Sequence, residues 1–193
     1  MKHVAVAVLV AVLAGCGASG TAAPTAPTGS PAATAAPTGQ GFNATDVMFL
    51  QMMVPHHGQG LEMVRIAQIR PVRPEVRMLA AAIESTQANE AENMAGWLRA
   101  WQQPAEAPAD SHAAHGGMPG TSAAEIATLR TASDADFERR FLNMLIAHQD
   151  DAIQMARMEA AGGANAQATG LAKQIDRSRT AQIKQMLAYL EPY

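Results

Sequence analysis

The sequence predicts an all-α protein, an up-and-down bundle of four helices made of two duplicated αα-hairpins. The chain repeats itself at an offset of 92 residues, and its apolar residues recur at helical spacing without a useful stretch of period-two alternation. With 193 residues, 48% hydrophobic composition and a formal charge of −3, it fits neither a disordered chain nor a polytopic membrane protein. No basic excess indicates a nucleic-acid partner.

The repeat keeps one register through two segments of each copy. In the first segment, Phe49, Met52, His56 and Met63 match Phe141, Met144, His148 and Met155. In the second segment, Leu79, Ile83, Met94 and Leu98 match Leu171, Ile175, Met186 and Leu190. Because a chance match would lose its register across a loop, the two copies, about 42–101 and 134–193, are predicted to be one duplicated unit.

Four long helices are expected over about 43–68, 74–101, 134–161 and 165–190, with a short additional one over 122–131. Asn43 or Thr45 is a candidate cap for the first and Ser133 for the third, while Gly162-Gly163 ends the third. Pro55 lies inside the first helix and is expected to kink it, unless the helix begins there. The connection over about 102–121 is rich in Pro and Gly and is expected to be a mobile linker.

The N-terminal segment is expected to be a targeting signal followed by a disordered linker. Lys2 precedes an apolar run, residues 4–13, that is too short to span a bilayer and that leads into Cys16. This pattern resembles a bacterial lipoprotein signal peptide, residues 1–15, in which Cys16 is acylated; an ordinary secretory signal is the alternative. Residues 16–41 read as a disordered Ala/Thr/Pro/Gly linker. We therefore expect a domain over 42–193 that is extracytoplasmic and lipid-anchored to a bacterial membrane.

Each copy places a ladder of Met, His, a polar residue and Met on the most apolar face of its first helix. The first ladder is Met52, His56, Gln59 and Met63, and the second is Met144, His148, Asp151 and Met155. Thioether sulfur and neutral imidazole together suit Cu(I) or Ag(I). The plain alternative is a methionine-filled core with hydrogen-bonded histidines, for which Gln87 or Glu90 would be the partner.

Further candidates surround the ladders. His57 lies about 100° from His56 on the helical wheel and is a candidate gate or second site. Gln59, Asp151, Gln87 and Glu90 are candidates for positioning the ligands. In the linker, His112, His115 and Met118 form either a metal-capturing arm or a polar connector with incidental histidines. Met94 and Met186 are expected to be core residues.

The pattern Phe49-x-x-Met52-x-x-Pro55-His56-His57-x-x-x-x-x-Met63 resembles the signature of the secreted DUF305 family, which has a ferritin-like four-helix fold. Ile83-x-x-x-Gln87-x-x-Glu90-x-x-x-Met94 resembles its second element, and the resemblance covers nearly all of residues 42–193. Some members are associated with copper or silver outside the cytoplasm, so the resemblance implies metal binding through Met and His. The chain departs from the usual pattern at Gly60, at His148-Gln149 and at Arg179 and Gln182, which implies a weaker or silent second half-site.

The favoured function is a membrane-tethered binder of a soft metal ion, with Cu(I) preferred. Met52, His56 and Met63 are the expected primary ligands, and Met144, His148 and Met155 complete or duplicate the site. Binding needs neutral imidazole, so affinity is expected to fall as the pH drops through about 6.5. A zinc site of His56, His148 and Asp151 is a lesser variant.

Two other functional classes were weighed against metal binding. An enzyme is not expected, because a di-iron site on this architecture needs Glu-x-x-His pairs and the sequence has none. The serious rival is a structural or interaction module whose Met-rich groove binds a partner helix or an apolar ligand. No feature of the sequence identifies a protein partner.

Overall fold

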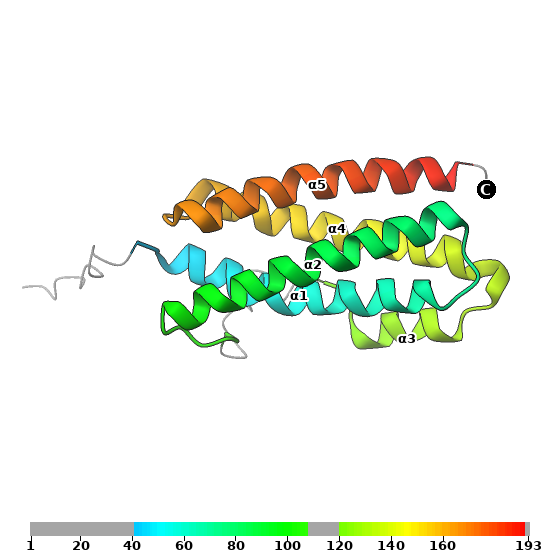
Figure 1. Ribbon diagram of the computed structural model, residues 1–193, viewed down its shortest axis with the longest axis horizontal. Coiled ribbons are helices and arrows are strands. Elements are labelled where there is room, and N and C mark those ends of the chain that lie inside the picture. The colour runs from blue at the N-terminus through cyan, green and yellow to red at the C-terminus, as the bar shows by residue number, and fades with distance from the viewer. Residues whose placement is uncertain (1–40, 108–119, 192–193) are drawn as a thin grey trace, which may run out of the picture. The chain divides into compact units, whose positions relative to one another are not determined.

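The structure, a computed structural model, describes residues 41–107 and 120–191, which form five helices (Figure 1). The helices are α1 (Ala44–Gln68), α2 (Pro74–Ala100), α3 (Ala123–Thr131), α4 (Asp134–Gly162) and α5 (Ala166–Leu190). The described residues contain no strand, so the predicted all-α bundle is confirmed. Each expected helix boundary lies within one residue of the observed boundary.

Polar caps determine where the helices begin. Asn43 Oδ1 accepts hydrogen bonds from the N–H groups of Thr45 and Asp46 at 2.8 and 3.1 Å, and Asp46 accepts the N–H of Asn43 at 2.6 Å. This reciprocal capping box satisfies N–H groups that the first turn of α1 leaves without helical partners. Ser133 caps α4 as expected. The helix α1 continues through Pro55, so it does not begin at that proline.

Helices α1 and α4 form an antiparallel central pair. At one end, Asn43 Nδ2 at the start of α1 donates to the carbonyl oxygen of Gly162 at the end of α4, at 2.8 Å. At the other end, Arg70, just after α1, forms an ion pair with Asp134, the first residue of α4, at 2.8 Å. Helix α2 packs on α1 and α5 packs on α4, while α3 lies mainly against α1 (Figure 1).

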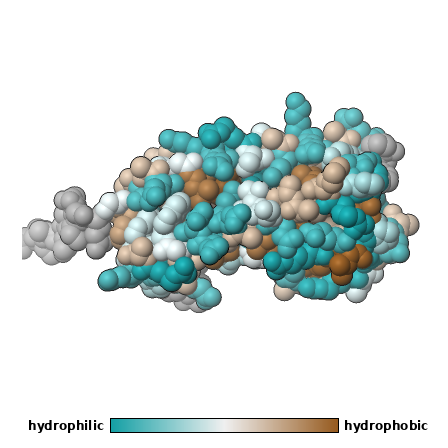
Figure 2. All heavy atoms as spheres, viewed as in Figure 1, coloured by the Kyte–Doolittle hydropathy of each residue, from teal (hydrophilic) through white to brown (hydrophobic). Residues whose placement is uncertain are grey.

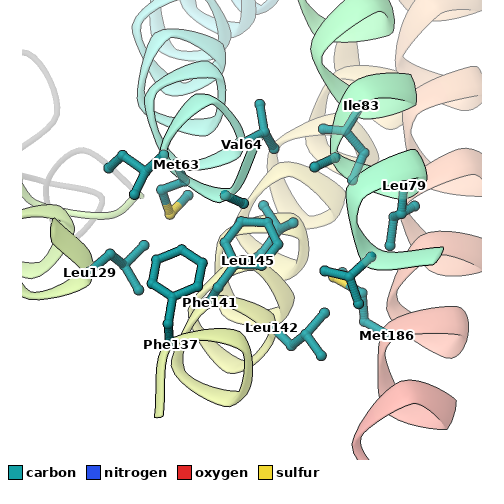
Figure 3. Packing of buried hydrophobic residues seen from close by; sticks show 14 of the residues in the cluster. Met63, Val64, Leu79, Ile83, Leu129, Phe137, Phe141, Leu142, Leu145 and Met186 are labelled. Carbon is teal, nitrogen blue, oxygen red and sulfur yellow. The ribbon is translucent and has the colours of Figure 1, made fainter. Parts of the chain in front are cut away.

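The apolar core consists of two clusters that a polar layer separates along the bundle. One cluster gathers near the start of α1 and the end of α4 and includes Phe49, Met52, Met94 and Met155. The other includes Met63, Phe137, Phe141 and Met186, and Figure 3 shows Met63 pointing into it. Between them lie seven polar side chains, which we call the central polar layer: His56, His57, Gln87, Glu90, His148, Gln149 and Arg179.

The outer surface is mostly polar on the face shown in Figure 2, where hydrophobic side chains form small separate patches. At the start of the described chain, the Phe42 ring stacks on Trp101, with ring centroids 4.4 Å apart. None of the helices in residues 41–107 and 120–191 is long and apolar enough to cross a membrane.

Candidate metal centre

The central polar layer draws side chains from all four long helices. None of its seven members is more than 5% exposed to solvent. Burying polar groups between two apolar clusters is costly unless they find partners, so each unpaired atom in this layer needs an explanation.

The middle of the layer is a stacked pair of histidines, His56 from α1 and His148 from α4. Their ring centroids lie 3.8 Å apart and the ring planes differ by 14°. The two residues occupy equivalent positions in the repeat, so the pseudo-twofold axis passes between them. Both ring nitrogens of His56 and Nε2 of His148 have no hydrogen-bond partner among the described residues. Only His148 Nδ1 has one, Thr121 Oγ1 at 3.2 Å.

Both stacked rings are held in the neutral state. Burial lowers the pKa of His56 well below 6.5, and the neighbouring His148, His57 and Arg179 lower it further. Burial also lowers the pKa of His148 to about 3, with His57 and Arg179 contributing. The rings therefore keep a lone pair for a ligand down to acidic pH. The expectation that protons compete with a metal from about pH 6.5 does not hold for these buried rings.

The four ladder methionines divide between the two apolar clusters. Met52 and Met155 belong to one, while Met63 and the half-buried Met144 pack in the other. Met52 and Met63 are eleven positions apart in one helix, or roughly 16 Å along its axis, so one metal ion cannot bind both. Met52 and Met144 each precede a stacked histidine by four residues and lie one turn away on the same face.

His57 occupies a different environment from His56. Its Nε2 atom lies 2.8 Å from Glu90 Oε2, and the guanidinium of Arg179 donates to the same carboxylate oxygen. His57 is fully buried, and this burial lowers its pKa although the bond to Glu90 opposes the shift. His57 is thus bonded as the hydrogen-bonded core alternative expects, with Glu90 as its partner.

In the second copy of this network, amides replace His57 and Glu90, while the ionisable Arg179 stands at the position of Gln87. Gln149 occupies the position of His57, and Gln182 that of Glu90; Gln149 Nε2 donates to Gln182 Oε1 at 2.5 Å. Gln87 Nε2 donates in turn to Gln149 Oε1 at 3.3 Å. Gln149 and Gln182, two of the departures from the family pattern, therefore lie together in this hydrogen-bonded group, whereas Arg179 is bonded to Glu90.

The polar positions of the ladders are hydrogen-bonded to the backbone of Gly120 and Thr121. Gln59 Oε1 accepts the N–H of Thr121 at 3.1 Å, and Asp151 accepts a hydrogen bond from the backbone of Gly120. Sequence reasoning missed Thr121, because it lies outside every long helix and so has no place in the helical periodicity. Gln149 was detectable through the repeat, since it follows His148 as His57 follows His56.

The remaining candidates are the zinc variant, the linker residues and Cys16. Within residues 41–107 and 120–191, no three His, Cys, Asp or Glu side chains are grouped so that they could hold a metal ion. This contradicts the zinc variant built on His56, His148 and Asp151, and it means that a metal site here would need thioether or other donors. His112, His115 and Met118 lie outside the described residues, as does Cys16.

The fold and its central layer define a class of protein, a duplicated four-helix bundle with a buried histidine pair flanked by methionines. The chain belongs to the family described as "Domain of unknown function (DUF305)", whose family model matches residues 46–190. No curated protein matches the chain at a significant level.

Three solved structures illustrate the similarity of fold. A DUF305 protein from Streptomyces coelicolor, inferred to be secreted, is 30% identical with a TM-score of 0.72, and the match covers 77% of this chain and 93% of that one. A DUF305 fragment from Deinococcus radiodurans is 30% identical, with a TM-score of 0.68 and coverage of 78% and 98%. CopM in the Cu(I)-bound form is 27% identical, with a TM-score of 0.64 and coverage of 78% and 98%.

Proposed function

We propose that this chain is an extracytoplasmic protein that binds a soft, singly charged metal ion, Cu(I) or Ag(I), at the histidine pair. The observation that carries the proposal is the set of three unpartnered nitrogens on the stacked rings of His56 and His148. When His148 Nδ1–H donates to Thr121, its Nε2 atom carries a free lone pair directed into the buried layer. Leaving such buried atoms without a ligand costs about 1–3 kcal/mol each.

The electrostatics of the layer favour a singly charged ion. The Arg179 guanidinium is already paired with the Glu90 carboxylate, and the donors around the stacked rings are neutral imidazoles and thioethers. No spare carboxylate of the layer balances a bound cation, so the desolvation cost of a divalent ion would be much larger. Soft thioether sulfur also prefers Cu(I) to hard divalent ions. We therefore propose His56 and His148 as central ligands, with Met52 and Met144 as the nearest thioethers and Met63 and Met155 farther along each ladder.

The relatives support the binding of copper or silver. CopM has been solved in Cu(I)-bound, Ag-bound and Cu(II)-bound forms. The Streptomyces relative supports a location outside the cytoplasm. We further propose acylation of Cys16 as the link to a membrane, and metal binding rather than catalysis as the activity. The rival partner-binding groove has less support, because Met52, Met63 and Met155 are each at most 3% exposed.

An anaerobic Cu(I) titration against a competing chelator tests the proposal. His56→Gln with His148→Gln should abolish tight binding, and Gln is a suitable replacement because Gln149 is accommodated in the same layer. Met52→Leu with Met144→Leu should weaken binding about tenfold or more, since Leu keeps the volume and removes the sulfur. The matched control is Met94→Leu with Met186→Leu, a repeat-related pair of buried core methionines that should bind as the wild type does. Wild-type affinity in the double His variant would overturn the proposal.

A further inference from the structure

The stacked histidines approach the surface at one place. A pocket of about 570 Å³ lies between α3 and α4, and its lining includes His148, Met144 and Asp151 from α4, Glu125 from α3, and Thr121 from the corner before α3. His148 itself is fully buried although it borders the pocket, so something covers it.

The cover is the corner formed by Gly120 and Thr121. The hydroxyl of Thr121 lies 3.2 Å from His148 Nδ1, which is the ring nitrogen on this side. Gly120 has φ +140°, and a Cβ on it would lie 3.3 Å from His56 Cδ2 and 2.2 Å from Gln59 Oε1. Only glycine therefore fits this conformation and this close approach to the ring. The corner thus covers the edges of both stacked rings.

Two side chains hold the corner in place, and they occupy equivalent positions in the repeat. Gln59 from α1 accepts the N–H of Thr121, and Asp151 from α4 accepts that of Gly120. Two such bonds are weak compared with the whole fold, so releasing the corner needs far less free energy than unfolding the bundle. The recurrence of a polar residue in both ladders has here a structural explanation that does not require it to be a metal ligand.

The pocket contains suitable groups for a cation in transit. The Met144 thioether and the Asp151 carboxylate border it one turn before and about one turn after His148. Arg139 and Arg140 also border it, but both face Asp136, at 3.3 and 4.0 Å, which offsets part of their charge. His57 on the other side of the layer is bonded to Glu90 and does not border this pocket.

We infer that the pocket between α3 and α4 is the port through which a soft cation reaches His148, and that Thr121 is the latch that closes it. The inference rests on the proposed function, because it assigns a route to the same site. A cation entering from the pocket first meets Met144, and release of the Thr121 hydroxyl from His148 Nδ1–H then opens the way to the lone pair on His148 Nε2 in the stacked pair.

Two rates test the port, and one of them needs no metal. In the metal-free protein, carbethoxylation of His148 by diethylpyrocarbonate, followed by mass spectrometry, reports access to its neutral nitrogen. Stopped-flow uptake of Ag(I) reports access for the ion itself. Thr121→Ala removes the latch, and Ala147→Trp fills the pocket from an exposed position in its lining. Ala188→Trp, on the exposed surface of α5, is the matched control.

We expect His148 to react faster than His57. Thr121→Ala should raise both rates about fivefold, the effect of losing one hydrogen bond of about 1 kcal/mol. Ala147→Trp should lower both rates by a similar factor without changing the Ag(I) stoichiometry, while Ala188→Trp changes neither. Equal carbethoxylation and Ag(I) uptake rates in Ala147→Trp and Ala188→Trp would overturn the inference that this pocket is the port. If the wild type takes up no Ag(I), the proposed function fails, and the carbethoxylation rates still decide whether the pocket gives access to His148.

Discussion

Asp46 and Glu138 perform the same task at opposite ends of the bundle. They are equivalent residues of the repeat, each in the first turns of its helix. Asp46 accepts the N–H groups of Ala164 and Asn165 just before α5, at 3.1 and 2.9 Å, and Glu138 accepts the N–H of Arg73 just before α2, at 2.7 Å. Each copy's first helix therefore fixes the start of the other copy's second helix.

Replacing Asp46 by Ala should lower the free energy of unfolding by about 1–3 kcal/mol, because it removes the acceptor of three partly buried hydrogen bonds from the N–H groups of Asn43, Ala164 and Asn165. Urea denaturation followed by circular dichroism measures the change. Glu92→Ala, on the exposed surface of α2, is the control and should differ from the wild type by no more than about 0.5 kcal/mol. A loss of the same size in both variants would contradict the stabilising role of the Asp46 hydrogen bonds.

Glu159 should make the bundle less stable as the pH rises. Burial, with Asp46 close by, raises the pKa of Glu159 from 4.5 to about 8. Between these values the folded state keeps a proton that the unfolded state has lost, so the free energy of unfolding falls as pH increases, by up to about 1.4 kcal/mol per unit. The decline should end above pH 8, where both states are ionised.

Glu159→Gln mimics the protonated carboxyl and should flatten this dependence. Thermal unfolding at pH 6.5 and 8 is the measurement, and the difference between the variant and wild-type slopes isolates Glu159, because buried histidines that gain protons only on unfolding near pH 6.5 affect both proteins equally. Glu92→Gln serves as the exposed control and should keep the wild-type slope. If Glu159→Gln keeps the wild-type slope, Glu159 is ionised in the folded protein and the assignment fails.

The Glu90–Arg179 pair should show strong coupling. Removing one partner leaves the other charge buried and uncompensated, so Glu90→Gln and Arg179→Gln should each cost about 3–5 kcal/mol. The double variant resembles the amide group that Gln87, Gln149 and Gln182 already form, and it should cost much less than the sum. A double-mutant cycle from denaturant unfolding measures the coupling. If the two single losses of unfolding free energy add up to the loss in the double variant, Glu90 and Arg179 are not coupled.

Affinity for Ag(I) should stay nearly constant from pH 7.5 to 5.5. A site of ordinary histidines with pKa 6.5 would lose about tenfold per ring by pH 5.5. With the pKa of His148 near 3 and that of His56 well lowered, protons do not compete in this range. Titration in non-coordinating buffers at constant ionic strength is the check. A tenfold loss by pH 5.5 would place the bound ion on histidines whose pKa is not lowered.

Gly60 should not tolerate alanine, although alanine favours helices by about 1 kcal/mol. A Cβ at this position would lie 2.3 Å from Gln87 Oε1 and 2.9 Å from His148 Nε2. Gly60→Ala should therefore displace the amide and the ring, lowering both the melting temperature and Ag(I) affinity. Gly170→Ala, where a Cβ meets nothing within 4 Å, is the control and should not destabilise α5. Equal behaviour of the two variants would contradict this packing.

Helix boundaries and pairing were accessible from the sequence because they depend on local signals and on the repeat. Asn43 and Ser133 have side chains that cap a helix whatever surrounds them. The register of the repeat aligns His56 with His148, so a pseudo-twofold bundle predicts related positions for them. For Gln149, Arg179 and Gln182, by contrast, the sequence showed a departure from the family pattern but not the hydrogen-bond partners.

The details of the site depend on tertiary contacts that no local pattern encodes. Helical periodicity places Met52 and Met63 on one face, but it does not say that they belong to different apolar clusters. The bond between Thr121 and His148 joins an irregular corner to a helix, and the bond between Arg179 and Glu90 joins two copies of the unit. Such contacts follow from the packing of whole helices, and the sequence alone did not suggest them.

The bonds around the start of α1 also govern how the domain would carry mechanical load. Asn43 is bonded to Gly162, Asn165 Nδ2 donates to the carbonyl oxygen of Gly41, and Phe42 stacks on Trp101. Tension along the chain before Gly41 is therefore passed at once to the end of α2 and to the turn between α4 and α5. A pulling force must shear these contacts together before it can peel α1 away, so both halves of the bundle share the strain.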